Sequence, residues 1–175
     1  PITHTQLRNG EHYDARREFK DWPTCAFVPD ARWRRAGLIP SPGGILEEET
    51  AIPCRVVRTF EITSQPTCFD VYDIGTNLSG RCRITVTGTQ PGARIVLDYA
   101  ERITEDGDLS KMAQDTYVKT GAFQHEEYTL KGDGTQEGWE SRFTYHGFRY
   151  VKVSLRGRVS LQKIEVREIR SDFES

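Results

Sequence analysis

The sequence predicts an all-β protein: an antiparallel β-sandwich or jelly roll with an irregular N-terminal arm. Apolar and polar residues alternate with period two through most of the chain, which is the pattern of strands that bury one face. About eight such stretches are separated by turn signals, including TQPGA, EDGD, KGDGTQEG and LRGR. No stretch carries a long helical stripe of apolar residues. Short strands at this spacing are typical of an antiparallel sandwich or barrel.

Length and charge limit the class of protein. The chain has 175 residues and a formal net charge of −2, which fits one domain of ordinary size. Neither nucleic acid nor a membrane is predicted as a partner, because Lys and Arg are not clustered and no apolar run approaches the roughly 20 residues that span a bilayer. The chain begins without Met and ends without a closing turn, so we expect a segment of a longer protein.

Residues 1–53 are predicted to be an arm and linker packed on the sandwich. Residues 9–22 combine charged and aromatic side chains. Trp22 and Trp33 either pack this arm onto the sandwich, which is the default, or stack on a sugar. Residues 37–53 contain three prolines and three glycines, which exclude a regular element and predict a surface linker.

Residues 54–175 are predicted to be the sandwich body. In 81–88, Cys82, Ile84 and Val86 share the face expected to be buried, and in 94–102 the same alternation recurs. The predicted strands are 54–62, 68–74, 81–88, 94–102, 115–121, 126–132, 143–155 and 159–169.

Cysteine usage predicts neither a zinc site nor a particular disulfide. The chain has four cysteines and no CxxC pair, which argues against a zinc site. Three complete pairings remain open, and buried thiols are favoured over disulfides. The cysteines are Cys25, Cys54, Cys68 and Cys82.

The stretch FTYHGFRYVKV (143–153) is predicted to be a central strand covered on both faces. Gly147 marks the place where alternation is disturbed, a usual position for a bulge. No acid or nucleophile is patterned around His146, so we expect a hydrogen-bonded structural histidine rather than a general base. One predicted face holds Phe143, Tyr145, Val151, Val153 and Leu155, and the other holds Thr144, His146, Phe148 and Tyr150.

Two polar stretches could hold a ligand. YDIGTNLSG (72–80) has the Gly, Asn and Asp content of a turn between two strands, and its side chains either cap that turn or bind a ligand. The acidic stretch 99–117 is either a solvated loop with a hairpin at Asp106-Gly107 or a Ca²⁺ site. No pair of carboxylates can be assigned as the acid and base of a glycosidase, so no catalytic residue is predicted.

Five stretches, in this order, resemble the bacterial-type α-L-rhamnosidases of glycoside hydrolase family 78: GEHYDARREF, YDIGTNLSGR, YAERITEDGDL, DTYVK and FTYHGFRYVKV. The resemblance runs from about Asn9 to Phe173 and is most specific in FxYHGFRY. It implies that this chain is the ancillary concanavalin-like β-sandwich of such an enzyme. The expected partner is the (α/α)₆ catalytic barrel of the same parent chain, which carries the catalytic acids in that family.

The resemblance also implies candidate ligand-binding residues. In some members the corresponding sandwich binds L-rhamnose through Ca²⁺, with a tryptophan packed on the sugar. Arg81 stands here where relatives often carry that tryptophan, which removes the stacking surface. The candidates for carbohydrate binding are Asp14, Asn77, Arg81, Asp106 and Asp108, and Asp106 and Asp108 are also the candidates for a metal.

The leading hypothesis is a non-catalytic sandwich that supports the catalytic barrel, with no cofactor required. The alternatives are a calcium-dependent L-rhamnose-binding module, a protein-interaction module that binds no sugar, and a chain that hydrolyses glycosides by itself.

Overall fold

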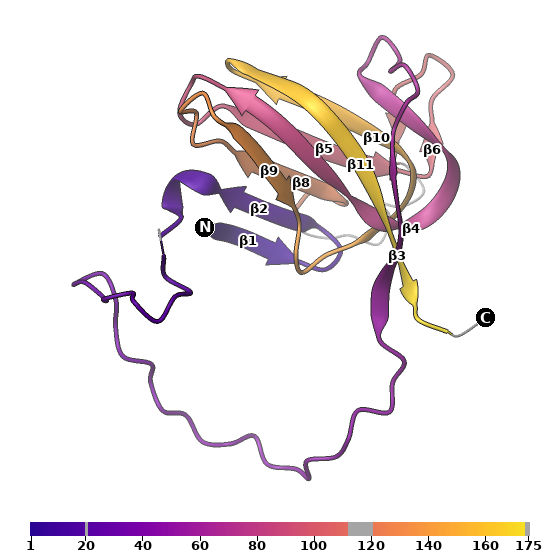
Figure 1. Ribbon diagram of the computed structural model, residues 1–175. Coiled ribbons are helices and arrows are strands. Elements are labelled where there is room, and N and C mark those ends of the chain that lie inside the picture. Colours follow the sequence, from indigo (N-terminus) through magenta and orange to yellow (C-terminus); the bar gives the residue numbers. More distant parts are fainter. Residues whose placement is uncertain (20, 112–120, 174–175) are drawn as a thin grey trace.

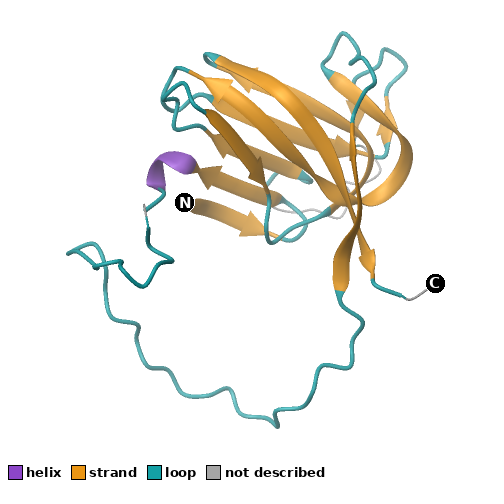
Figure 2. Ribbon diagram, in the orientation of Figure 1, coloured by secondary structure: helices purple, strands orange, loops and turns teal. Residues whose placement is uncertain are grey.

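Almost all regular structure in this protein is β-strand, arranged as a β-sandwich (Figures 1 and 2). The computed structural model describes residues 1–19, 21–111 and 121–173. No helix in these ranges is long and apolar enough to span a membrane. The elements are β1 (Ile2–Gln6), β2 (Gly10–Asp14), a 3₁₀ turn η1 (Ala15–Arg17), β3 (Cys54–Glu61), β4 (Val71–Gly88), β5 (Arg94–Ala100), β6 (Arg102–Ile103), β7 (Leu109–Ser110), β8 (His125–Thr129), β9 (Gln136–Glu140), β10 (His146–Arg156) and β11 (Val159–Ser171).

Strand pairing divides the sandwich into two layers that share β4. In the first layer the order is β1-β2-β8-β5-β10, and the first part of β4 pairs with β10. In the second layer the later part of β4 pairs with β9 and β11, and β3 pairs with β11. Apart from β2 and β8, which run parallel, the paired strands in both layers are antiparallel. Figure 1 shows β11, in yellow, crossing in front of β5. The predicted antiparallel β-sandwich is confirmed, with this one parallel pair as an exception.

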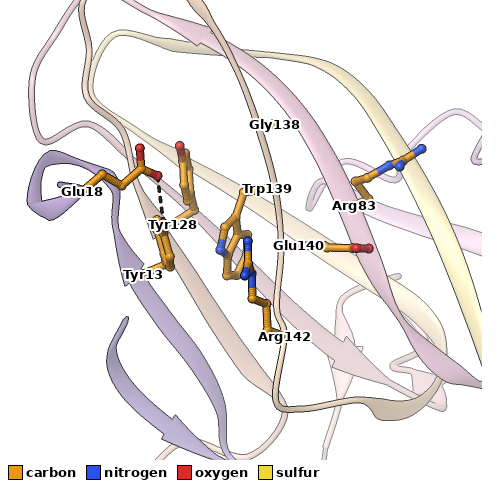
Figure 3. A pocket seen from close by; sticks show the side chains of 8 residues that line it. All are labelled: Tyr13, Glu18, Arg83, Tyr128, Gly138, Trp139, Glu140 and Arg142. Carbon is orange, nitrogen blue, oxygen red and sulfur yellow. Dashed lines mark hydrogen bonds between the residues drawn. The ribbon is translucent and has the colours of Figure 1, made fainter. Parts of the chain in front are cut away.

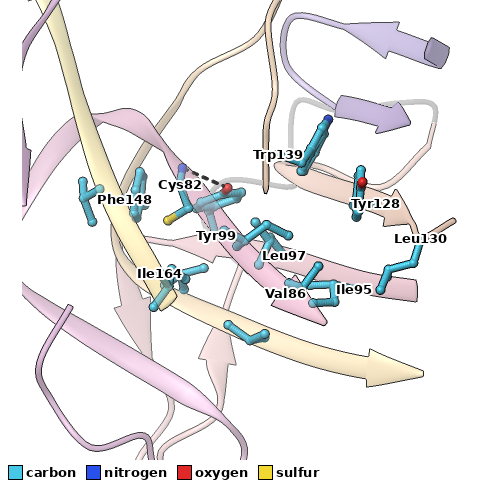
Figure 4. Close-up of a cluster of buried hydrophobic side chains, with 14 of the residues drawn as sticks. Cys82, Val86, Ile95, Leu97, Tyr99, Tyr128, Leu130, Trp139, Phe148 and Ile164 are labelled. Carbon is cyan, nitrogen blue, oxygen red and sulfur yellow. Dashed lines mark hydrogen bonds between the residues drawn. The ribbon is translucent and has the colours of Figure 1, made fainter. Parts of the chain in front are cut away.

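The inner faces of the two layers meet in one hydrophobic core (Figure 4). Cys82, Ile84 and Val86 of β4 are fully buried there, as their alternation predicted. From the opposite layer, β5 contributes Ile95, Leu97 and Tyr99, β8 contributes Tyr128, and β10 contributes Phe148, Val151 and Val153.

β10 is the central strand that the sequence predicted, but its faces are not those predicted. It lies between β5 and β4, and its register against β4 shifts between Phe148 and Tyr150. This irregularity changes the phase of alternation, so His146 and Phe148 before it face the core together with Val151 and Val153 after it. The predicted face that united Phe143 and Tyr145 with Val151, Val153 and Leu155 is therefore wrong, since Phe143, Tyr145 and Leu155 are exposed.

The irregularity has a counterpart in β4. Asp73 pairs with Tyr150 and Leu78 pairs with Phe148, so the four β4 residues 74–77 lie opposite the single residue Arg149. The carboxylate of Asp73 accepts hydrogen bonds from both Nε and Nη2 of Arg149 at 2.9 Å and from the backbone N–H of Gly75 at 2.7 Å. YDIGTNLSG is thus a wide bulge inside one long strand, rather than a turn between two strands. Its Gly75 has a φ of +84°, which a side chain would disfavour.

The N-terminal arm has two different parts. β1 and β2 extend the edge of the first layer by pairing with β8, although the sequence prediction had placed these residues in an irregular arm. From 21 to 53 the chain forms a long open loop without helix or strand (Figure 2). Almost every side chain in this loop is exposed, so the loop does not pack on the sandwich as predicted. Its prolines, glycines and scattered apolar residues offer no continuous face to bury.

Three smaller predictions have mixed outcomes. Asp106-Gly107 does form a hairpin, between β6 and β7. All four cysteines are free thiols, but only Cys82 is buried, so the prediction of burial was wrong for Cys25, Cys54 and Cys68. The strand predicted at 115–121 and the carboxylate of Asp115 lie outside the described residues, apart from Gly121.

Candidate functional site

The five residues predicted to bind sugar lie on separate parts of the sandwich. They are Asp14 on β2, Asn77 and Arg81 on β4, and Asp106 and Asp108 between β6 and β7. Within the described ranges, no hydrogen bond or ion pair joins two of them. The same ranges contain no group of three or more His, Cys, Asp or Glu side chains placed to hold a metal ion. The structure does not bring the five together as one preformed site.

Two of these carboxylates already have cationic partners. Asp14 caps η1 and accepts hydrogen bonds from the backbone N–H of Arg16 at 3.1 Å and from its guanidinium at 2.8 Å. The Arg16 guanidinium holds the pKa of Asp14 below its usual value. Asp108 accepts a hydrogen bond from Nζ of Lys152 at 2.7 Å, and this contact likewise lowers the pKa of Asp108. A ligand at either carboxylate would have to compete with a neighbouring cation.

His146 belongs to a buried polar cluster between the strands. Its Nε2 lies 3.0 Å from Oε1 of Glu126, and the hydroxyl of Tyr99 donates to Oε2 of Glu126 at 2.7 Å. The backbone N–H of Cys82 donates to the same hydroxyl at 3.3 Å. Burial raises the pKa of Tyr99 well above its usual value, which keeps the hydroxyl a donor. All these side chains are sealed from solvent, so His146 is buried and hydrogen-bonded, as the sequence predicted.

One end of the sandwich exposes a group of large apolar side chains, which we call the apolar face: Leu7, Phe143 and Tyr145. Their exposed fractions are 59%, 65% and 43%. Together with Val56 and Ile169 they line a hollow of about 280 Å³, whose lining also includes Arg55, Arg81 and Arg142. Exposed apolar side chains that gather at one place, rather than singly, indicate a surface that contacts another molecule or domain.

A buried carboxylate holds the apolar face in position. Glu11 is fully buried, and its carboxylate accepts the backbone N–H groups of Arg142 at 3.2 Å and Phe143 at 3.3 Å. Burial raises the pKa of Glu11 even though these hydrogen bonds oppose the shift. The hydroxyl of Thr144 donates to the carbonyl oxygen of Leu7 at 2.9 Å. The loop between β9 and β10 is therefore fixed to the β1–β2 hairpin, and its exposed rings are presented in a defined position.

A second hollow, which we call the Trp139 pocket, lies between β2, β8, β9 and β4 (Figure 3). Its volume is about 460 Å³, within the range of about 300–1,000 Å³ common for small-molecule sites. The lining residues are Tyr13, Glu18, Arg83, Tyr128, Gly138, Trp139, Glu140 and Arg142.

Three aromatic rings form one wall of this pocket. The rings of Tyr128 and Trp139 stack with centroids 5.4 Å apart, and those of Tyr13 and Tyr128 stack at 5.9 Å. The hydroxyl of Tyr13 donates to Oε1 of Glu18 at 2.8 Å, and that of Tyr128 donates to Oε2 of Glu137 at 2.7 Å. Burial raises the pKa of both tyrosines, so the hydroxyls remain protonated donors that keep the wall rigid.

Arg81, the predicted sugar ligand on β4, is directed towards the carboxylate of Glu140. Its Nε lies 3.6 Å from Oε2 of Glu140, and Nε of Arg167 lies 3.4 Å from the same oxygen. Arg81 is thus part of the charged surroundings of the Trp139 pocket and is separated from the exposed Asn77 in the bulge.

Sequence reasoning missed the residues around which these surfaces are built. Glu11, Glu126, Trp139 and Arg142 carry no local pattern that separates a buried or pocket-lining side chain from an ordinary surface one. Glu11 and Phe143 did lie within stretches of family resemblance, which is the one signal that could have drawn attention to them.

Comparison with known proteins relates the whole chain to one group. Residues 64–170 match the family model described as the bacterial alpha-L-rhamnosidase concanavalin-like domain, and residues 1–58 match the alpha-L-rhamnosidase N-terminal domain. An alpha-L-rhamnosidase from Streptomyces avermitilis is 34% identical over 159 residues, which are 88% of this chain. A solved alpha-L-rhamnosidase from Dictyoglumus thermophilum superposes with a TM-score of 0.87 at 36% identity and covers 100% of this chain.

A solved Streptomyces avermitilis alpha-L-rhamnosidase complexed with L-rhamnose has a TM-score of 0.81 at 30% identity over 98% of this chain. The chain spans only 15% of the length of the first of these relatives, and 20% and 16% of the two solved chains. Each relative therefore contains other domains in the same polypeptide.

Proposed function

Because this chain belongs to the bacterial alpha-L-rhamnosidase family, through its concanavalin-like domain, we propose that it is a non-catalytic β-sandwich that supports a catalytic domain acting on terminal α-L-rhamnosides. The fraction of the relatives that it spans fits an ancillary role, since most of each relative lies outside the matched region. The proposed partner is the (α/α)₆ catalytic barrel of the same parent chain.

The observation that carries this proposal is the apolar face. Phe143 and Tyr145 are large exposed rings on a loop whose backbone is anchored to the buried carboxylate of Glu11. Exposed aromatic rings are unfavourable in water, and their burial by a partner stabilises the complex. Because these rings are already held in position, they lose little conformational entropy on binding. The last strand, β11, supplies Ile169 to the same hollow, so the face lies beside the end of the sandwich body.

We expect the isolated chain to give no turnover of an aryl α-L-rhamnoside. In the parent enzyme, we expect the double change Phe143→Ser and Tyr145→Ser to lower the free energy of unfolding by at least about 2 kcal/mol, the size of one interface hot spot. The same double change in the isolated chain should leave stability nearly unaltered, because both rings are exposed there.

The matched control replaces Leu38 and Ile39 by serine, since both are exposed apolar residues of the long loop. That control should leave the free energy of unfolding unchanged in both the parent enzyme and the isolated chain. Turnover by the isolated chain that a single Asp→Asn change abolishes would overturn the non-catalytic role. An unchanged parent stability in the apolar-face variant would overturn the docking role.

A second candidate is calcium-dependent L-rhamnose binding by this sandwich. It is favoured by the exposure of Asn77 in the β4 bulge and of Asp106 in the β6–β7 hairpin, with Asp108 beside it. Calorimetric titration of L-rhamnose with millimolar Ca²⁺, and again with excess EDTA, tests it. Saturable heat that requires calcium and disappears in Asn77→Ala would support this binding, and the absence of heat in both conditions would exclude it.

A further inference from the structure

We propose that the Trp139 pocket binds a sugar acid, that is, a saccharide with one carboxylate beside its hydroxyl groups. This role would be additional to support of a catalytic domain and does not depend on it. The pocket is distinct from the five residues that the family resemblance suggested, because Trp139, Tyr13 and Arg142 are not among them.

The charge of the pocket favours an anion. Among the described residues the guanidinium of Arg142 forms no ion pair, although its side chain is exposed and lines the pocket. The other three charged lining residues each have an oppositely charged partner outside the pocket, so the charge of Arg142 is not balanced by them. Their ion pairs are Glu18 with Lys131 at 2.6 Å, Arg83 with Glu165 at 2.8 Å, and Glu140 with Arg81 and Arg167 at 3.6 and 3.4 Å.

The hydrogen-bonding groups of the rim favour hydroxyls on the same ligand. The side chain of Glu140 lines the pocket and is 25% exposed, while its Oε2 is buried beside the Arg81 and Arg167 guanidinium groups and has no hydrogen-bond partner within the described part of the chain. Glu18 and Glu140 would repel a doubly charged phosphate but would accept hydrogen bonds from sugar hydroxyls. A ligand with a single negative charge and several hydroxyl donors satisfies both the arginine and the two carboxylates.

The aromatic wall contributes a hydrogen-bond donor and a ring surface to the proposed site. Trp139 is 7% exposed, and within the described residues its indole N–H has no acceptor. A buried donor without an acceptor is costly, and a ligand oxygen that enters beside Arg142 can fill that need. In Figure 3 the indole nitrogen lies on the side of Tyr13 and Tyr128, and the partly exposed edge of Tyr13 offers a surface for a sugar ring.

The test uses the indole N–H resonance of Trp139 in a ¹H–¹⁵N correlation spectrum of the whole chain. The chain has three tryptophans, and the change Trp139→Phe identifies the relevant signal. We expect titration with sodium D-glucuronate to shift this signal saturably. D-Glucose, which has CH₂OH in place of the carboxylate, should shift it far less, and so should inorganic phosphate.

The variant Arg142→Gln keeps the backbone N–H that Glu11 accepts and replaces the guanidinium with a neutral amide. We expect it to weaken glucuronate binding about tenfold or more, the range expected for loss of a charge-assisted hydrogen bond. The control Arg94→Gln removes an arginine paired with Glu127 on β5 and should leave the affinity unchanged.

Several results would overturn the proposal. These are no shift of the Trp139 signal with glucuronate, an equal shift with glucose or phosphate, and an unchanged affinity in Arg142→Gln. A shift produced by a tetraglutamate peptide but not by glucuronate would instead make the pocket a contact for an acidic protein segment.

Discussion

Replacing Phe148 by alanine is expected to lower the free energy of unfolding by about 3–5 kcal/mol, the usual cost of removing a large ring from a core. Phe148 is fully buried on β10, the strand held between β5 and β4. Its ring packs edge-on against Tyr99 with centroids 4.7 Å apart. The loss therefore combines buried apolar area, an aromatic pair and a cavity that both layers border.

Urea denaturation of the isolated chain measures this loss, and Phe143→Ala is the matched control. Phe143 lies five positions earlier in the same stretch but is 65% exposed, so its removal should cost less than about 0.5 kcal/mol. Equal losses in the two variants would contradict the burial of Phe148 in the core and the exposure of Phe143.

Replacing Glu126 by alanine should destabilise the protein by about 2–6 kcal/mol. The change leaves the Tyr99 hydroxyl and the His146 ring without their acceptor, and each buried orphan costs about 1–3 kcal/mol. Glu126→Gln keeps one acceptor oxygen and nearly the same volume, so its cost should be smaller. The expected order of loss places Glu126→Ala first and Glu126→Gln second.

The neighbouring Glu127→Ala is the control for this series, since Glu127 is paired with Arg94 near the surface. Its cost should stay within about 1 kcal/mol. A double-mutant cycle of Glu126→Ala with Tyr99→Phe should give a coupling free energy clearly different from zero, because the two side chains share a hydrogen bond at 2.7 Å. Additive losses would contradict the account of one connected cluster.

Both experiments also bear on FTYHGFRYVKV, the stretch that most resembles the family. Its His146, Phe148 and Val151 serve the core, its Arg149 fixes the β4 bulge, and its Phe143 and Tyr145 face outwards. One sequence segment thus joins the stability of the sandwich to the surface that we propose for docking. Substitutions in it should therefore divide into two classes, according to whether the side chain is buried in the core or exposed on the apolar face.

Much of the architecture could be predicted because it depends on near neighbours in the sequence. Period-two alternation identified the buried faces of 81–88 and 94–100, where no bulge interrupts the strand. Asp106-Gly107 identified its own hairpin, since a turn needs only adjacent residues with suitable backbone preferences. The resemblance of five stretches identified the family, which the match over residues 64–170 confirms.

The sequence by itself determined the all-β class, several strands of the sandwich body, the Asp106-Gly107 hairpin and the family of this protein. Only the tertiary structure decided that β1 and β2 join β8, that Asp73 and Arg149 stabilise a bulge that shifts the faces of β10, and that Glu11 and Glu126 are buried. It also decided that Arg142 and Trp139 line one pocket while Asp14, Asn77 and Asp108 stand apart. The physical reason is that these features depend on contacts between residues far apart in the chain. Whether a side chain is buried, and whether its charge is paired, depends on the residues that pack against it, and local alternation does not identify those residues.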